Sequence, residues 1–215
     1  MKTVAVSMAA LVFLSGSAYG LGPDIDQCLS TVSLADCSQN NINICPEGDT
    51  EMITDQCGGN GYISLTVVDA EMQGVPGIAV TDYWLESCNS SYDLILCGGL
   101  TADSLTNEDG KTTISGNIAG SGCVLDEGIC IVVQGKHILQ EPGCVEPTCL
   151  DFEIRSPDYI PDGIVDLSDF SSLISSWSFC SSQAGYNECF DFIDNDCIDL
   201  SDFAYFAMHW QHQCR

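Results

Sequence analysis

Basic residues and histidines are scarce in this sequence, and each shortage disfavours a class of function. The chain has 5 Lys+Arg against 31 Asp+Glu, which gives a formal net charge of -26 and an isoelectric point near 4.1. So acidic a chain repels phosphates, which argues against nucleic-acid binding. With 3 His and no Cys-x-x-Cys pair, the sequence also argues against a metal site built on its cysteines. The excess of carboxylates suits hard cations instead.

The motifs of common enzyme classes are missing as well. There is no Gly-x-Ser-x-Gly, no His-Glu-x-x-His and no phosphate-binding loop. His137, His209 and His212 have no recognisable nucleophile nearby in the sequence. We interpret His209 and His212, which flank Trp210, as surface or packing residues rather than as ligands. The sequence therefore predicts that this protein is not an enzyme.

Long apolar segments are limited to the N-terminus. Lys2 precedes an apolar run over residues 4–14, and Ala18-Tyr19-Gly20 has the small-x-small pattern of a cleavage site. We interpret residues 1–20 as a signal peptide; the alternative is an uncleaved anchor. The run is too short for a membrane span, and no later segment approaches the ~20 apolar residues that a span needs. A secreted or cell-surface protein is predicted.

The sequence is rich in cysteine, and every cysteine follows the predicted signal peptide. In an oxidising compartment these residues are expected to form disulfides, whose pairing the sequence leaves open. Close pairs such as Cys88 with Cys97, Cys123 with Cys130, and Cys180 with Cys189 are candidates for local cross-links. The cysteines are Cys28, Cys37, Cys45, Cys57, Cys88, Cys97, Cys123, Cys130, Cys144, Cys149, Cys180, Cys189, Cys197 and Cys214.

Three zones follow the signal peptide. Residues 21–60 are polar and cysteine-rich, with one alternating stretch over 30–34 that predicts a strand. Residues 61–154 are predicted to be all β, because Ile63, Leu65 and Val67 alternate with polar residues and turn signals recur about every 8–12 residues, as in a β-sandwich. The expected strands cover residues 62–68, 77–81, 83–85, 93–97, 111–115, 129–133 and 150–154.

Part of this zone is similar to a known family. Residues 65–69, 74–80 and 106–113 resemble bacterial immunoglobulin-like domains of the invasin-repeat type. The resemblance implies an immunoglobulin-like β-sandwich. It implies little about function, since this fold serves many roles.

The C-terminal zone, residues 155–215, contains an internal duplication. The run Asp-Leu-Ser-Asp-Phe at residues 166–170 recurs at 199–203, an offset of 33 residues (199 minus 166). Asp158 and Trp177 recur as Asp191 and Trp210 at the same offset.

An EF-hand calcium loop takes oxygen ligands from positions 1, 3, 5, 7, 9 and 12 and turns sharply at position 6. Each copy matches this spacing at every ligand position except position 3. Gly163 and Asp196 occupy position 6. Position 3, usually Asp or Asn, is Ile160 or Ile193, so a water or carbonyl must replace that ligand. The predicted Ca²⁺ ligands are Asp158, Asp162, Ile164 (carbonyl), Asp166 and Asp169 in loop 1, and Asp191, Asn195, Cys197 (carbonyl), Asp199 and Asp202 in loop 2.

A helix is predicted after each loop, with an apolar stripe for the core. The stripes are Phe170, Leu173, Ile174 and Trp177, and then Phe203, Phe206 and Trp210. Two calcium ions would turn the repulsion among the carboxylates into attraction, so that binding energy becomes folding energy. The alternative is that the carboxylates form only a solvated acidic face.

Asp at position 12, a helix only after each loop, and the duplication together resemble type I dockerin modules. The resemblance covers residues from Ser156 to about Gln213. It implies Ca²⁺ in both loops and docking onto cohesin domains. By the same resemblance, loop positions 10 and 11 contact the partner, and these are Leu167, Ser168, Leu200 and Ser201.

Three functional hypotheses follow for this mainly β, disulfide-rich chain. The first is a calcium-stabilised structural or adhesive protein, such as a filament subunit in which strand 30–34 completes a neighbour's sheet. No flexible linker precedes the calcium module, which favours this self-contained role. The second is a dockerin-bearing subunit that binds a cohesin scaffold. The third is a carbohydrate-binding module that stacks glycans on Trp84, Tyr83 or Tyr92, against the alternative that Trp84 belongs to the core.

Overall fold

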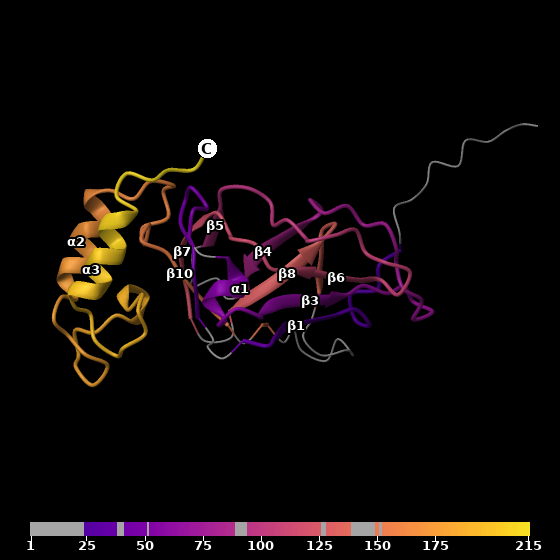
Figure 1. Ribbon diagram of the computed structural model, residues 1–215, viewed down its shortest axis with the longest axis horizontal. Helices are drawn as coiled ribbons and strands as arrows, with labels where there is room; N and C mark the ends of the chain where they lie inside the picture. Colours follow the sequence, from indigo (N-terminus) through magenta and orange to yellow (C-terminus); the bar gives the residue numbers. More distant parts are fainter. Residues whose placement is uncertain are drawn as a thin grey trace, which may run out of the picture.

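The computed structural model describes residues 24–37, 41–50, 52–88, 94–125, 128–138, 149–150 and 152–215. The predicted signal peptide lies outside these residues, as do Tyr92 and Cys144. The chain is mainly β, with three sheets and several disulfides (Figure 1). No helix in the described part of the chain has the length and apolar character to span a membrane.

The secondary structure changes character along the chain. The strands are β1 (Thr31–Ala35), β2 (Asn41–Asn43), β3 (Tyr62–Thr66), β4 (Tyr83–Ser87), β5 (Leu94–Leu96), β6 (Lys111–Ile114), β7 (Gly120–Val124), β8 (Ile129–Val133), β9 (Lys136–Ile138) and β10 (Glu153–Arg155). The helices are α1 (Ile53–Gln56), α2 (Leu167–Ser175) and α3 (Leu200–Met208), with a 3₁₀ turn, η1 (Glu188–Phe190). Strands thus dominate up to residue 155, and the two longest helices follow.

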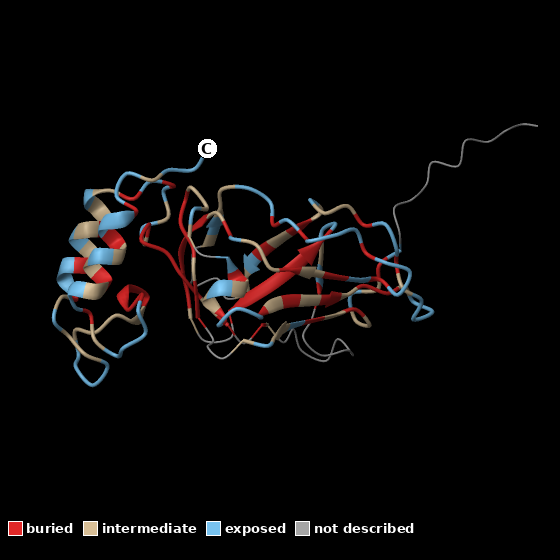
Figure 2. Cartoon of the chain, in the orientation of Figure 1, coloured by how far each residue is buried: buried red, intermediate tan, exposed pale blue. Residues whose placement is uncertain are grey.

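The strands form sheets of order β1-β3-β6, β2-β10-β7-β5 and β4-β8-β9. Their pairings are antiparallel except for β2 with β10, which is parallel. The predicted alternation of β3 is confirmed, because Ile63 and Leu65 are buried and Ser64 is half-buried. All five residues of β8 are buried, as the apolar run predicted (Figure 2).

The prediction of a strand over residues 77–81 was wrong. Gly77 has φ +80° after Pro76, and the chain turns again where Asp82 N–H bonds to the Ala79 carbonyl at 3.0 Å. Ile78 is nevertheless buried, and its N–H bonds to the Thr106 hydroxyl at 2.9 Å. The apolar composition of residues 77–81 therefore indicated a buried segment, but its backbone is not extended.

Two separate clusters of buried apolar residues make up the core. The larger one spans the sheets and includes Ile63, Leu85 and Ile131. The smaller one lies between the calcium-loop sequences and their helices and contains Val165, Leu173, Phe190, Phe192, Ile198 and Phe206. In Figure 1 helices α2 and α3 lie side by side at one end of the molecule, beyond β10 and β7.

Disulfides connect this helical end to the sheets. Cys123 on β7 bonds to Cys189 in η1, and Cys97 after β5 bonds to Cys214 near the C-terminus. The backbone joins the two parts as well, because Gly122 N–H in β7 donates to the Asp158 carbonyl at 2.7 Å. The first residue of the predicted calcium loop is therefore fixed to β7, an inner strand of the second sheet.

Several expectations about the cysteines need correction. Cys97, Cys123 and Cys180 do not pair with their near neighbours in sequence, since the bonds are Cys97–Cys214, Cys123–Cys189 and Cys180–Cys197; Cys37–Cys57 is also formed. Cys123 and Cys130, for example, lie on β7 and β8, which belong to different sheets.

Two further departures concern Cys88 and Cys45. The Cys88 sulfur lies within bonding distance of the sulfurs of both Cys130 and Cys149. One sulfur makes one disulfide, so Cys88 bonds to one of these two cysteines at a time. Cys45, expected to be in a disulfide, is a free and buried thiol.

Candidate metal centre

The first predicted calcium loop begins directly after β10 and ends in the first turn of α2. Asp158 and Asp169, at positions 1 and 12, are both fully buried. Asp158 Oδ2 accepts the Gly163 N–H at 2.8 Å. The two oxygens of Asp169 accept the N–H groups of Ile160 and Asp166, each at 2.9 Å. Two buried carboxylates thus organise the backbone of the whole loop.

Asp166, at position 9, also starts the helix. It is the N-cap of α2 and forms a capping box with Asp169, and its Oδ1 accepts the Ser168 N–H at 2.7 Å. The same carboxylates therefore shape the loop and fix the direction in which the helix leaves it.

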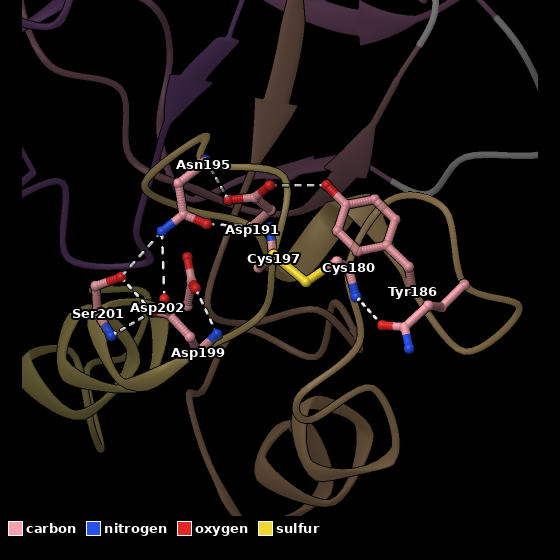
Figure 3. Close-up of a disulfide and its surroundings, with 9 residues drawn as sticks. Cys180, Tyr186, Asp191, Asn195, Cys197, Asp199, Ser201 and Asp202 are labelled. Atoms are coloured by element: carbon pink, nitrogen blue, oxygen red, sulfur yellow. Dashed lines mark hydrogen bonds between the residues drawn. A yellow bond between two sulfur atoms is a disulfide. The ribbon is translucent and has the colours of Figure 1, made fainter.

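The second loop repeats the position-12 contacts, whereas its position-1 carboxylate accepts from position 5 and from the Tyr186 hydroxyl. Asp191 Oδ1 accepts the Asn195 N–H at 3.0 Å, and Asp202 accepts the N–H groups of Ile193 and Asp199 at 3.1 and 2.9 Å. Figure 3 shows the side chains of Asp191, Asn195, Asp199 and Asp202 gathered in this loop beside the Cys180–Cys197 disulfide. The duplication seen in the sequence is thus a duplication of local structure.

The sharp turn at position 6 is present in both loops. Gly163 has φ +87° and Asp196 has φ +66°, which place both residues in the left-handed region. Glycine adopts this region freely, and Asp is among the residues that tolerate it. Asp196 can therefore replace the glycine without changing the course of loop 2.

Burial acts strongly on the charges of these carboxylates. It raises the pKa of Asp158 to about 6, with further increases from the Asp169 and Asp162 charges, against the lowering effect of the Gly163 N–H. The nearby Ser121 hydroxyl also lowers this pKa. Asp158 Oδ1 is nevertheless buried, and no described residue forms a hydrogen bond of standard geometry with it.

At positions 9 and 12, the pKa of the loop carboxylate shifts in the same direction in both copies. Burial is the main cause of the raised pKa of Asp169 and Asp202 at position 12. At position 9, the hydroxyl and N–H of the following serine lower the pKa of Asp166 and Asp199. At positions 9 and 12 the direction of the pKa shift thus follows burial in both loops.

The remaining predicted ligands lie at the surface of the loops. Asp162 and Asn195 are exposed, and each accepts the N–H of position 7, from Ile164 at 3.1 Å and from Cys197 at 3.0 Å. The isoleucine side chains at position 3, Ile160 and Ile193, are also exposed. They contribute no ligand atom, as the sequence indicated.

The predicted docking residues divide into two kinds. Leu167 and Leu200 begin the two helices and are 66% and 70% exposed. Ser168 and Ser201 instead use their hydroxyls to bond the carboxylates of Asp166 and Asp199. An apolar groove of about 460 Å³ adjoins Leu167, lined by Leu167, Phe170, Phe203, Phe206, Ala207 and Trp210.

The predicted apolar stripes are only partly buried. Leu173 and Phe206 lie in the second core cluster, and Phe170, Phe203 and Trp177 pack against it. Ile174 and Trp210 are exposed, which corrects the expectation that they belong to the core. The C-terminal segment therefore carries apolar side chains that are exposed to solvent.

The expected glycan-stacking residues do not form one platform. Tyr83 is fully buried, and Tyr92 lies outside the described residues. Trp84 is half-buried on β4, and its indole N–H donates to Glu86 at 2.8 Å.

Two groups of ligand-type atoms occur among the described residues outside the predicted calcium loops. In one, Cys45, Asp49, His209 and His212 place their ligand atoms within 4.8 Å of one another. Cys88, Cys130 and Cys149 form another, which their shared disulfide explains. Sequence analysis missed the first group because its members are far apart in the chain and have no motif spacing.

Comparison with known protein families finds no family model that matches this chain, and comparison with curated proteins finds none that is similar.

Proposed function

We propose that this protein is a secreted or cell-surface structural or adhesive protein, stabilised by calcium and disulfides. In this proposal the sheets form an immunoglobulin-like sandwich, and residues 155–215 form a dockerin-like module with two Ca²⁺ sites. The observation that carries it is the repeated loop: the carboxylates at positions 1 and 12 are buried in both copies, and each position-12 carboxylate accepts the same two backbone N–H groups, from positions 3 and 9.

The residues present fit calcium. Asp158 Oδ1 is a buried oxygen without a full hydrogen bond, at the position where an EF-hand loop places its first ligand. Asp158, Asp162, Asp166, Asp169 and the Ile164 carbonyl would hold the ion in loop 1. Asp191, Asn195, Asp199, Asp202 and the Cys197 carbonyl would do so in loop 2. A bound ion would neutralise the buried carboxylates, and its binding energy would stabilise the fold.

The attachment of the module supports a structural role. The disulfides Cys97–Cys214 and Cys123–Cys189 fix it to the sheets, and β10 leads into loop 1 without a linker. A module that docks on a distant scaffold gains from a flexible tether, whereas this one is rigidly cross-linked. The predicted signal peptide and the disulfides agree with an extracellular location.

Strand exchange is the less favoured route to a filament. The predicted exchanging strand is β1, which pairs with β3 of its own chain from Thr31↔Thr66 to Ala35↔Tyr62. The Cys37–Cys57 disulfide closes directly after it. Exchange would have to break five residue pairs beside a covalent cross-link, so we favour association through preformed surfaces.

The structural role predicts assemblies larger than one chain. Size-exclusion chromatography with light scattering, and electron microscopy of the same fractions, are expected to show assemblies in millimolar Ca²⁺ and smaller species in EGTA. A protein that stays monomeric in both conditions, at every concentration tested, would contradict the structural assembly.

Binding to a cohesin-like scaffold is the second candidate function, and the exposure of Leu167 and Leu200 favours it. We expect Leu167→Asp with Leu200→Asp to abolish capture by cohesins while Ca²⁺ binding and the melting temperature stay nearly unchanged, since both side chains face solvent. Leu105→Asp, on another exposed leucine, is the matched control. If wild-type protein is captured by no cohesin, this candidate is wrong.

A further inference from the structure

A second kind of metal site is indicated where the C-terminus meets the sheets. Cys45 and Asp49 lie in the segment between β2 and α1, and His209 and His212 lie at the end of α3. Cys45 Sγ is 3.4 Å from His212 Nδ1, which is 3.3 Å from His209 Nδ1. Asp49 Oδ1 is 3.5 Å from His209 Nδ1 and 3.3 Å from His212 Nδ1.

These separations fit four ligands around one small ion. Zinc binds thiolate, imidazole and carboxylate at about 2.0–2.3 Å in a tetrahedron, which places neighbouring ligand atoms about 3.3–3.6 Å apart. The four distances above, from 3.3 to 3.5 Å, lie in that range. One sulfur, two imidazole nitrogens and one carboxylate oxygen suit Zn²⁺, whereas Ca²⁺ prefers oxygen ligands alone.

The backbone under these side chains is fixed. The Gly48 N–H bonds to the Cys45 carbonyl at 2.9 Å, which closes the turn that carries Asp49. His212 donates its N–H to the His209 carbonyl at 3.0 Å and accepts the Val165 N–H at 2.9 Å. The ligand atoms therefore converge from held segments and need little rearrangement to bind an ion.

Without an ion, the two imidazole rings share one carboxylate. Their Nδ1 atoms lie 3.3 Å apart, and Asp49 Oδ1 is within 3.5 Å of both. A Zn²⁺ ion would accept both Nδ1 lone pairs, and the Cys45 thiol would release its proton to solvent. The thiolate and the Asp49 carboxylate together would balance the two positive charges of the ion.

An outer partner and an entry route are also present. Glu47 Oε2 lies 3.9 Å from His212 Nε2, on the side of the ring away from the cluster, where carboxylates often orient a ligating histidine. Asp49 and His209 line a cavity of about 610 Å³, so an ion can reach the cluster from solvent.

We propose that Cys45, Asp49, His209 and His212 bind one Zn²⁺ ion, which clips the C-terminal segment to the loop between β2 and α1. All four positions are filled by protein side chains, which is typical of a structural zinc site. The site shares no ligand with the predicted calcium loops, and it does not rest on the proposed function.

The test titrates Zn²⁺ into zinc-depleted, oxidised protein in millimolar Ca²⁺. Wild-type protein is expected to bind one equivalent. Loss of a residue that only orients a ligand weakens metal binding by about 10–100-fold. His212→Gln removes a ligand itself and should weaken Zn²⁺ binding by more than that. His137→Gln is the matched control, since His137 is exposed on β9 and pairs with Glu86 at 2.7 Å instead of with a member of the cluster. Asp169→Ala, which changes the first predicted calcium loop, should still bind one equivalent of Zn²⁺.

Co²⁺ serves as a spectroscopic probe of the sulfur ligand. A thiolate-to-cobalt absorption band is expected in wild type and in His137→Gln, and it should be absent in Cys45→Ser. Because Cys45 is buried, Cys45→Ser can fail to fold, and the half-buried His212→Gln then provides the test by itself. Equal Zn²⁺ affinity in wild type and His212→Gln, or no binding by wild type, would overturn the proposal.

Discussion

Chelation of calcium is expected to lower the melting temperature of the oxidised protein by about 8 °C or more for each loop. An ion present at about 1,000 times its dissociation constant stabilises the folded state by about 4 kcal/mol, and a domain of this size shifts by about 2–4 °C per kcal/mol. The physical reason is the pair of buried carboxylates in each loop, whose repulsion a bound cation would relieve. Differential scanning calorimetry in Ca²⁺ and in EGTA measures the effect.

Single substitutions separate the two loops. Asp169→Ala and Asp202→Ala each remove the buried position-12 carboxylate of one loop, so each should reproduce about half of the EGTA effect. Asp109→Ala is the charge-matched control, because Asp109 is exposed in the turn before β6. EGTA also removes zinc, so the melt is repeated in His212→Gln. Equal melting temperatures in EGTA and in Ca²⁺ would contradict stabilisation by calcium.

Arg155→Met is expected to cost about 3 kcal/mol, which corresponds to about 6–12 °C in melting temperature. Arg155 is buried on β10, and its guanidinium reaches Glu153 at 2.7 Å, Glu188 at 3.0 Å and Asp194 at 3.2 Å. It also donates to the Asp191 carbonyl at the start of loop 2. The expected cost lies at the lower end of the range for a broken buried pair, because Glu188 and Asp194 are half-exposed and can rehydrate.

The chain supplies a matched control for this substitution. Arg215 pairs with Glu47 at 2.8 Å, but its side chain is 80% exposed. Exposed ion pairs contribute little to stability, so Arg215→Met should leave the melting temperature nearly unchanged. Similar shifts for both variants would show that Arg155 does not connect β10 to loop 2 in the way proposed.

Local patterns in the sequence predicted local structure well. The alternation around Ile63 and Leu65 predicted β3, and the apolar run over residues 129–133 predicted β8. The duplicated Asp-Leu-Ser-Asp-Phe runs predicted two helices that start at the same point of two equivalent loops. Each of these features is set by residues within a dozen positions of one another.

The features that the sequence missed depend on distant contacts. β7 has the sequence Gly-Ser-Gly-Cys-Val, which has no strand pattern, yet it is buried between β10 and β5. Small residues are required there, since a side chain on Gly120 would meet the Ile95 carbonyl at 3.0 Å. The Cys97–Cys214 disulfide and the convergence of Cys45 with His212 arise only when segments more than 100 residues apart meet.

The central claim is that the twin loops bind calcium, and counting bound ions tests it most directly. Native mass spectrometry of the oxidised protein, after exchange into calcium-containing buffer, is predicted to show two Ca²⁺ ions on wild type, one on Asp169→Ala and one on Asp202→Ala, with two retained on Asp109→Ala. Wild-type protein without bound calcium, or equal calcium counts in all four proteins, would contradict the account.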